Sequence, residues 1–222
     1  DHVDILWVHV WDRDTPIEET IRALDDVVRD GKVLYLGVSD TPAWVVARAN
    51  TIAELRGWTP FTGLQVPYSL LRRDIERELL PMAEDVDLAV TAWSPLASGV
   101  LSGKFLEGDP GPTRVDPSTI SERDTAITRE VVAVATELGV TPSQVAIAWL
   151  RQRSPRVLPI LGAKTVEQLR DTLGALDVEL PAAAVARLDD VSAIELGFPT
   201  DMLAGLHDFM YGPIGSLVDH RP

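Results

Sequence analysis

Polar and aromatic side chains follow five apolar segments of the chain, each at the point where the segment ends. A histidine in such a position could move a proton or polarise a carbonyl group, although a lone histidine after an apolar run is also often a core residue. Serine, aspartate and glutamine could hydrogen-bond a carboxamide, and a tryptophan could stack on a planar ring. Together the set suits a planar, hydrogen-bonding ligand. Its members are His9 with Trp11 and Asp12, Ser39 with Asp40, Gln65, Trp93 with Ser94, and residues 162–165.

Two of these segments could also bind phosphate. Residues 94–104 are mostly small or apolar, include glycine and end in Gly103-Lys104. Their backbone N–H groups could surround a pyrophosphate while Lys104 supplies positive charge. Residues 162–165 lead into a predicted helix, whose N-terminus favours an anion, and Lys164 could contact a ribose phosphate. A phosphate site of this second kind occurs in many barrels and does not by itself identify an enzyme.

The segments that position these residues alternate between strand-like and helix-like runs. The first four strand-like runs begin near residues 4, 33, 62 and 88, at intervals of 26 to 29 residues. This is the βα repeat of a doubly wound sheet or of a (β/α)8 barrel, in which the carboxyl ends of the strands form the active site. Several runs are apolar throughout, as parallel strands covered on both faces are. The predicted strands are Ile5–Val10, Val33–Val38, Thr62–Val66, Leu88–Trp93 and Val157–Leu161.

Helix signals occupy the intervals between the strands. The sequence predicts N-terminal capping boxes at Thr15–Glu18, at Thr141–Gln144 and at Thr165 with Gln168. The segment Glu107–Pro117, rich in Gly, Pro and Asp, predicts a surface loop. No domain boundary is evident, so residues 1–222 are predicted to form a single domain. The predicted helices span residues 17 to 31, 41 to 56 and 74 to 85, begin again at 142, span 165 to 176, and begin last near 181.

Composition limits the classes of function. The net charge of −14 argues against nucleic-acid or anionic-membrane partners. The chain has no cysteine, which excludes disulfides and thiolate metal sites, and we expect no metal centre. No apolar run reaches the roughly 18 residues of a membrane-spanning helix. We therefore expect a cytoplasmic protein.

The ordered motifs resemble the aldo-keto reductases, and within that family a bacterial-type branch. The resemblance covers roughly Val3 to Pro199 and implies a (β/α)8 TIM-barrel domain. The residues that carry it are Val3-Asp4-Ile5-Leu6-Trp7-Val8-His9, Thr15-Pro16-Ile17-Glu18-Glu19, Gly31-Lys32-Val33-Leu34-Tyr35-Leu36-Gly37-Val38-Ser39, Gln65-Val66-Pro67-Tyr68-Ser69, Trp93-Ser94-Pro95-Leu96, Gly162-Ala163-Lys164-Thr165 and Ile194-Glu195-Leu196-Gly197-Phe198-Pro199.

The resemblance implies reduction of an aldehyde or ketone to an alcohol with NADPH, NADH being the open alternative. It makes His9 the catalytic residue that orients the carbonyl. Trp11 is a candidate wall of the substrate pocket, as is the tail near Met210-Tyr211. Asp40, Asp171 and Thr172 stand where Asn, Glu and Asn are commoner. The cofactor-binding residues that the resemblance implies are Ser39, Asp40, Gln65, Trp93, Ser94, Pro95, Leu96, Gly99, Leu101, Lys104, Gly162, Ala163, Lys164, Thr165, Gln168, Asp171 and Thr172.

The catalytic Tyr, Lys and Asp of the family belong to its first three βα units, whereas this chain matches from the fourth strand to the eighth. We therefore expect an incomplete barrel of about five of the eight units, whose open edges a second copy or a partner chain covers. Three hypotheses follow. The first is a carbonyl reductase that uses NADPH and is complete only with the missing units. The second is a truncated, non-catalytic nucleotide-binding or regulatory relative completed by a partner. The third, a phosphate-binding isomerase or aldolase, lacks a Schiff-base lysine in a strand and clustered carboxylates. For the isolated 222-residue chain we expect little or no hydride transfer.

Overall fold

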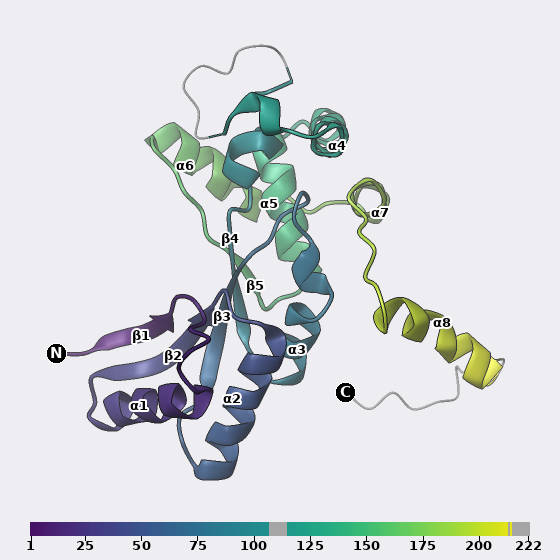
Figure 1. Cartoon of the computed structure of the whole chain (residues 1–222). Coiled ribbons are helices and arrows are strands. Elements are labelled where there is room, and N and C mark those ends of the chain that lie inside the picture. The colour runs from purple at the N-terminus through teal and green to yellow at the C-terminus, as the bar shows by residue number, and fades with distance from the viewer. Residues whose placement is uncertain (107–114, 213, 215–222) are drawn as a thin grey trace.

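The computed structural model describes residues 1–106, 115–212 and 214. Five parallel strands form one open sheet in the order β1-β2-β3-β4-β5 (Figure 1). Strands that neighbour one another in sequence also pair in the sheet, as in consecutive units of a (β/α)8 barrel, so the predicted parallel α/β class is confirmed. The strands are β1 (Val3–Val8), β2 (Val33–Ser39), β3 (Phe61–Pro67), β4 (Ala89–Trp93) and β5 (Val157–Pro159).

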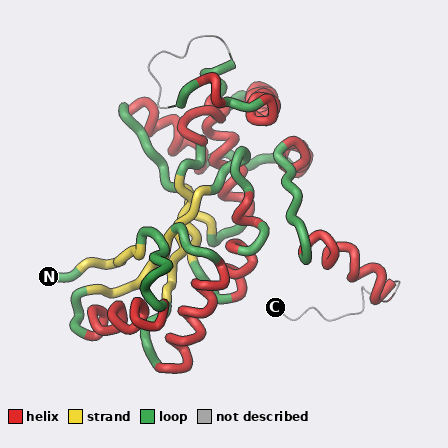
Figure 2. Tube along the Cα trace, in the orientation of Figure 1, coloured by secondary structure: helices red, strands yellow, loops and turns green. Residues whose placement is uncertain are grey.

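Helices connect the strands, as Figure 2 shows in red and yellow. Helices α1, α2 and α3 contact β2, β3 and β4, and α5 contacts β5. The α-helices are α1 (Ile17–Arg29), α2 (Ala43–Arg56), α3 (Leu79–Asp85), α4 (Glu122–Leu138), α5 (Pro142–Arg153), α6 (Val166–Leu173), α7 (Ala182–Val191) and α8 (Thr200–Tyr211). Short 3-10 helices are η1 (Asp74–Glu76), η2 (Ala97–Ser102), η3 (Pro117–Thr119) and η4 (Gly174–Leu176).

The two faces of the sheet differ in burial. The face toward the helices forms the core. Its side chains that are at most 2% exposed include Leu36, Val38, Leu64, Val66 and Val90. The opposite face carries exposed apolar side chains, among them Ile5 at 47%, Tyr35 at 56% and Leu158 at 53%. The predicted strands were apolar nearly throughout, which is the pattern of strands covered on both faces. In this structure helices cover only one of those faces.

One predicted capping box is wrong and one is half formed. The N-cap of α1 is Pro16, which has no side chain to accept a hydrogen bond, and the Thr15 hydroxyl instead donates to the Asp12 carboxylate. Thr165 does accept from the Gln168 backbone N–H, but the Gln168 side chain accepts from the N–H of Lys164. The box at Thr141 is confirmed in both directions.

The predicted helix over residues 74–85 is interrupted. It divides into η1 and α3 because Pro81 is the third residue of α3. A proline ring clashes with the carbonyl four residues earlier, here that of Arg77, so a continuous helix through that position is excluded. Strand β5 ends at Pro159, two residues before the predicted end, and β1 spans Val3–Val8 instead of residues 5–10.

Two helices were not predicted. Helix α4 begins with a full capping box, in which the Ser121 side chain accepts from the Asp124 N–H and the Asp124 carboxylate accepts from the Ser121 N–H. This sequence signal was present in the chain. Helix α8 lies away from the sheet in Figure 1. Most of the predicted loop Glu107–Pro117 lies outside the described residues, and Pro117 itself begins η3.

Among the described residues, no single helix is long and apolar enough to cross a membrane. Helices α4 and α5 meet the length and composition criteria only as a pair, and that pair is bent by 98°. Both helices contribute to the buried core, through Val131 and Val134 of α4 and Trp149 of α5.

Candidate functional site

The strand register brings predicted site residues together at the carboxyl edge of the sheet. Ser39 is the Cα partner of Gln65, and Gln65 is the partner of Thr91. Trp93 lies two residues beyond Thr91 on β4, nearer this edge, and pairs with Pro67. His9 follows Val8, the last residue of β1, which pairs with Val38. Because side chains alternate along a strand, Ser39, Gln65 and Trp93 share one face of the sheet.

Trp7 fixes the end of β1 against its neighbours. It pairs with Gly37, which in turn pairs with Gly63, so that two adjacent strands present glycine beneath one indole ring. A Cβ at Gly37 would lie 2.4 Å from Trp7 Cε3, and a Cβ at Gly63 would lie 3.0 Å from Trp7 Cη2. The two glycines thus make room for Trp7, two residues before His9.

The turn after β2 explains the residue type at position 40. Asp40 has φ +43°, a left-handed conformation that Asn and Asp adopt more readily than other residues with side chains. Ser39 is only 2% exposed, and its carbonyl accepts a 2.8 Å hydrogen bond from the Thr41 hydroxyl. Asp40 is exposed beside it. Asp and Asn therefore serve the same backbone role at this turn.

The loop after β4 has an unusual backbone. Ser94, Ala97, Ser98, Gly99 and Gly103 all have positive φ, which lies in the left-handed region. Strained backbone of this kind tends to gather at ligand sites. Several amides of the loop are already used within it, since the N–H groups of residues 97, 99, 101 and 103 donate to loop carbonyls. The expectation that backbone amides surround a pyrophosphate stays a prediction, and it is confined to the remaining N–H groups.

Three predicted residues of this loop differ in their surroundings. Pro95 is buried and Leu101 is 0% exposed, so they shape the loop from inside. Lys104 is exposed, and its Nζ lies 4.9 Å from the centroid of the Phe105 ring. A Cβ at Gly99 would lie 3.1 Å from that Nζ. The lysine charge therefore lies against the left-handed turn at Gly99.

A cavity of about 340 Å³ opens between this loop and the segment after β3. Trp93 and Ser94, both predicted site residues, line it together with Ser69, Ser98, Arg72 and Asp124. The side chain of Arg72 makes no hydrogen bond or ion pair within the described part of the chain, so it offers a positive charge to a ligand. Arg72 and Asp124 are not among the predicted site residues, because nothing in their spacing along the sequence places them near Trp93.

The second predicted phosphate segment, residues 162–165, is exposed throughout. Two other predicted residues, Asp171 and Thr172, lie further along the chain and form hydrogen bonds within the protein. The Asp171 carboxylate accepts a 2.8 Å hydrogen bond from the Thr141 hydroxyl, and the Thr172 hydroxyl donates to carbonyls of its own helix and is 5% exposed. The assignment of Asp171 and Thr172 to an adenine site stays a prediction, whereas Lys164 is free to meet an anion at the surface.

An aromatic pair lies beyond the ends of β1 and β2. The rings of Trp11 and Trp44 meet edge to face with centroids 5.6 Å apart. The guanidinium carbon of Arg13 lies 5.5 Å from the centroid of the Trp11 ring. Trp11 is a predicted site residue and Trp44 is not, although Trp44 occupies the first turn of α2, four residues after Asp40. Met210 and Tyr211 lie on α8, which Figure 1 shows away from the strand ends.

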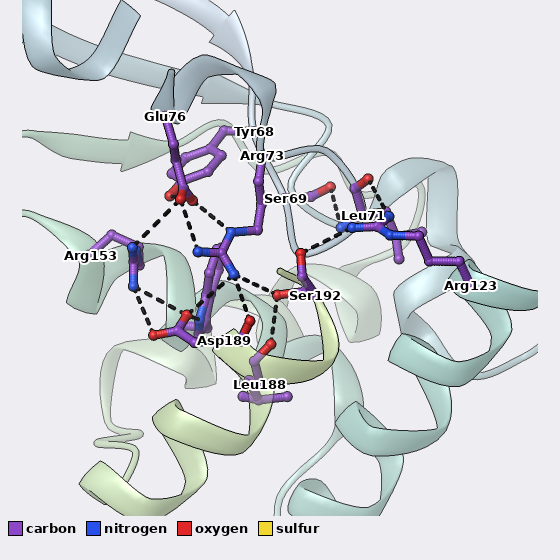
Figure 3. Close-up of polar contacts among 11 residues, drawn as sticks. Tyr68, Ser69, Leu71, Arg73, Glu76, Arg123, Arg153, Leu188, Asp189 and Ser192 are labelled. Atoms are coloured by element: carbon purple, nitrogen blue, oxygen red, sulfur yellow. Dashed lines mark hydrogen bonds and ion pairs between the residues drawn. The ribbon is translucent and has the colours of Figure 1, made fainter. Parts of the chain in front are cut away.

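A buried polar cluster ties the segment after β3 to α5 and α7 (Figure 3). Arg73 donates to both carboxylate oxygens of Glu76, at 2.8 and 2.9 Å, and to Ser192 at 2.8 Å. The Tyr68 hydroxyl donates to Glu76 at 2.6 Å, and Arg153 donates to Asp189 at 3.0 Å. The cluster holds the base of the loop that lines the cavity.

Electrostatics keep Glu76 ionised inside this cluster. Burial alone would raise the pKa of the Glu76 carboxyl. The hydrogen bonds from Arg73 and Tyr68, together with the charges of Arg73 and Arg153, outweigh burial and hold the pKa below its ordinary value of 4.5. Burial and the hydrogen bond to Glu76 raise the pKa of the Tyr68 phenol, so this tyrosine is a poor proton donor.

These shifts predict an acid-sensitive fold. A carboxyl whose pKa is lowered on folding stabilises the protein above its unfolded value, about 4.5 for Glu76, and this stabilisation is lost as the pH falls through the folded pKa. We expect Glu76→Gln to flatten the pH dependence of stability below about pH 4.5, and urea midpoints measured across pH will check this. Parallel curves for the variant and the unmodified chain would contradict it. Glu84→Gln, an exposed change on α3, is the control.

No group of three or more metal-ligating side chains occurs within residues 1–106, 115–212 and 214. The residues described above make up the candidate site: His9, the face formed by Ser39, Gln65 and Trp93, the cavity that Trp93 lines, and the exposed Lys104 and Lys164. These groups can hold a planar ring, hydrogen-bond an amide and bind phosphate.

Comparison with known proteins adds the following. A model of the aldo/keto reductase family matches residues 1–193. An aryl-alcohol dehydrogenase of Pestalotiopsis microspora is 37% identical over 213 residues, which are 96% of this chain and 55% of that protein. An NADP(+) aryl-alcohol dehydrogenase of Phanerodontia chrysosporium is 37% identical over 207 residues, covering 89% and 54%. A norsolorinic acid reductase of Emericella nidulans is 36% identical over 203 residues, covering 91% and 52%. The chain thus spans about half the length of these relatives.

Proposed function

Because the chain belongs to the aldo/keto reductase family, we propose that it is an oxidoreductase that reduces an aldehyde or ketone to an alcohol with NADPH. One observation carries the proposal most directly. The register places Ser39, Gln65 and Trp93 on one face of the sheet at its carboxyl edge, and Trp93 also lines the cavity. A carboxamide-bearing ring stacked on Trp93 would find hydrogen-bonding partners in Ser39 and Gln65, on the same face of the neighbouring strands.

The described residues fit such a cofactor. Trp93 would stack on the nicotinamide, Ser39 and Gln65 would hydrogen-bond its carboxamide, and Lys104 and Lys164 would meet its phosphates. Both lysines are exposed, and the turn at Gly99 would let the backbone approach a phosphate closely. The nicotinamide, when bound, supplies the hydride. NADPH is preferred over NADH in this proposal because Lys164 is exposed beside the N-terminus of α6, where a ribose phosphate would gain charge and dipole together.

His9 would act on the substrate carbonyl. The residue is exposed one position beyond β1, and the strand behind it is held by Trp7. An imidazole N–H there would hydrogen-bond the carbonyl oxygen, which orients the carbon and stabilises negative charge that develops on the oxygen. The relatives named aryl-alcohol dehydrogenases make aromatic aldehydes the first substrates to test.

The cofactor part of the proposal predicts a specific loss on Trp93→Ala. Removing a stacking ring is expected to weaken NADPH binding by about tenfold, the equivalent of about 1.4 kcal/mol. Calorimetric titration of the 222-residue chain with NADPH and with NADH measures this. Trp44→Ala, another tryptophan at the strand ends but outside the cavity, should leave NADPH affinity within about twofold. Equal affinity of the unmodified chain and of Trp93→Ala for NADPH would contradict the proposal.

A second candidate is a nucleotide-binding relative without turnover. The observation that favours it concerns the three tyrosines of the chain. Tyr68 is 0% exposed and bonded to Glu76, Tyr35 lies opposite Ile5 in mid-sheet, and Tyr211 is on α8. None of the three lies beside His9 as a proton donor. The isolated chain is expected to transfer little or no hydride under either candidate, so the assay adds the first three βα units of the family as a second chain. NADPH binding without aldehyde-dependent oxidation of NADPH in that mixture would favour the second candidate over the first.

A further inference from the structure

The aromatic pair at the strand ends has an asymmetry that bears on the substrate. Trp11 is partly buried, with the Arg13 guanidinium near its ring and Trp44 at an edge-to-face contact. Trp44 is 57% exposed, and it makes no other ring contact in the described part of the chain. Trp11 therefore supports its neighbour, and Trp44 is the ring that is open to a ligand.

The position of Trp44 is set by two separate elements. Trp11 belongs to the loop after β1, whereas Trp44 lies in the first turn of α2, where Ala43 and Val45 on either side are buried. The buried neighbours anchor the helix, and the edge-to-face contact restrains the indole from the other side. A ring held in this way binds a partner without losing much rotamer freedom, which favours affinity.

His9 brings chemistry close to this ring. Only one residue, Val10, separates His9 from Trp11, so their Cα atoms are at most about 7 Å apart. Trp11 in turn touches Trp44 at 5.6 Å between centroids. A small molecule whose carbonyl oxygen is bonded to His9 can therefore extend its other end over Trp44.

The size of the exposed Trp44 ring and the charged residues near it indicate that its ligand is a small planar molecule. A tryptophan buries at most about 250 Å², whereas a stable protein partner covers about 800 Å² on each side. Along the chain, Asp12 and Arg13 follow Trp11 and Asp40 precedes Trp44 by four residues, and all three are exposed and charged. A single exposed indole with charged residues close to it in sequence suits a small planar molecule better than a protein surface.

We propose that Trp44 is a substrate-contact residue that selects aromatic over aliphatic carbonyl compounds, and that Trp11 with Arg13 positions it. The inference rests on the proposed function for the identity of the reacting group, the carbonyl. It goes beyond that function because it assigns the substrate ring to α2, through a residue that no motif of the chain includes.

The test compares benzaldehyde with cyclohexanecarbaldehyde, two aldehydes of similar size of which only the first is aromatic. Saturation-transfer NMR titrations of the 222-residue chain without NADPH give both affinities. We expect Trp44→Ala to weaken benzaldehyde binding by about tenfold and cyclohexanecarbaldehyde binding by less than about twofold. Trp44→Phe, which keeps a ring, should stay within about threefold. Leu55→Ala, at the far end of α2 and 80% exposed in the parent, is the matched control and should change neither.

Three results would overturn the proposal: unchanged benzaldehyde affinity in Trp44→Ala, an equal loss for both aldehydes, or no benzaldehyde binding by the unmodified chain. The NADPH titration of Trp93→Ala is scored separately. If NADPH does not bind but the Trp44 selectivity holds, the cofactor assignment fails and the ring contact stands. If NADPH binds and the selectivity is absent, the Trp44 contact fails and the cofactor assignment stands.

Discussion

Arg73→Ala is expected to lower the free energy of unfolding by about 3 kcal/mol. The Arg73 side chain is 9% exposed, and it neutralises Glu76, whose side chain is 13% exposed. Removal leaves a buried carboxylate without its main partner, an effect worth roughly 3 to 5 kcal/mol. Arg153 lies 3.8 Å from Glu76 and retains part of the compensation, which is why we expect the lower end of that range.

The loss also removes hydrogen bonds that join distant segments. Arg73 donates to the carbonyl of Asp189 and to the hydroxyl of Ser192, both in or beside α7, so the segment after β3 loses these two direct hydrogen bonds to that helix. Because the same segment lines the cavity through Ser69 and Arg72, a looser loop should also weaken ligand binding there. Urea unfolding followed by circular dichroism measures the first effect.

The neighbouring arginine supplies the control. Arg72 is exposed and has no ion pair within the described residues, so Arg72→Ala should change stability by less than about 0.5 kcal/mol. Arg73→Lys keeps the charge but loses the two-point contact with Glu76, so its stability should lie between those of Arg72→Ala and Arg73→Ala. If Arg72→Ala and Arg73→Ala were equally stable, the cluster would not hold the fold as described.

Gly37→Ala is expected to destabilise the protein by about 2 kcal/mol, within the range for overpacking. Its added Cβ would lie 2.4 Å from a ring carbon of Trp7, well inside contact distance. That atom is part of the indole framework, so the ring must move as a whole. The end of β1 moves with it, and the change should lower the affinity for any ligand that needs His9.

A double-mutant cycle separates the clash from other effects of alanine. In a Trp7→Ala background the ring is gone, so Gly37→Ala should cost less than about 0.5 kcal/mol there. Gly162→Ala is the control in the unmodified chain, because nothing lies within 4 Å of its added Cβ and its φ is not positive. A cost for Gly37→Ala that persisted without Trp7 would contradict the steric explanation. Urea midpoints of all four chains measure the cycle.

Local signals in the sequence predicted the structure correctly where both interacting residues lie within a few positions of each other. Three of the five strands, β2, β3 and β4, match their predicted ranges within one residue at each end, and the Thr141 box forms as predicted, because alternation and capping depend on residues a few positions apart. The Thr15 box failed for a local reason too, since Asp12 competes for the Thr15 hydroxyl. The break before α3 was readable from Pro81 and was missed.

Contacts between distant segments were not accessible in the same way. Nothing near Arg73 in sequence points to Ser192 or Asp189, and nothing near Trp11 points to Trp44. These pairs meet because parallel strands order their loops along one edge of the sheet and because α5 packs against β5 and α4 while α7 packs against α4. The cavity has the same origin, since Arg72 follows β3, Trp93 ends β4 and Asp124 lies in the first turn of α4.

The sequence by itself determined the succession of βα units, the residue types at each strand end and the likeness to the aldo-keto reductases, because these depend on short-range patterns. Only the tertiary structure decided which of those residues share a face, that Asp171 is bonded by Thr141 at the start of α5 and Thr172 by its own helix, and that Trp44 is the exposed ring in contact with Trp11. The reason is physical: hydrophobic periodicity specifies that a face is buried, whereas register and helix packing specify what lies next to it.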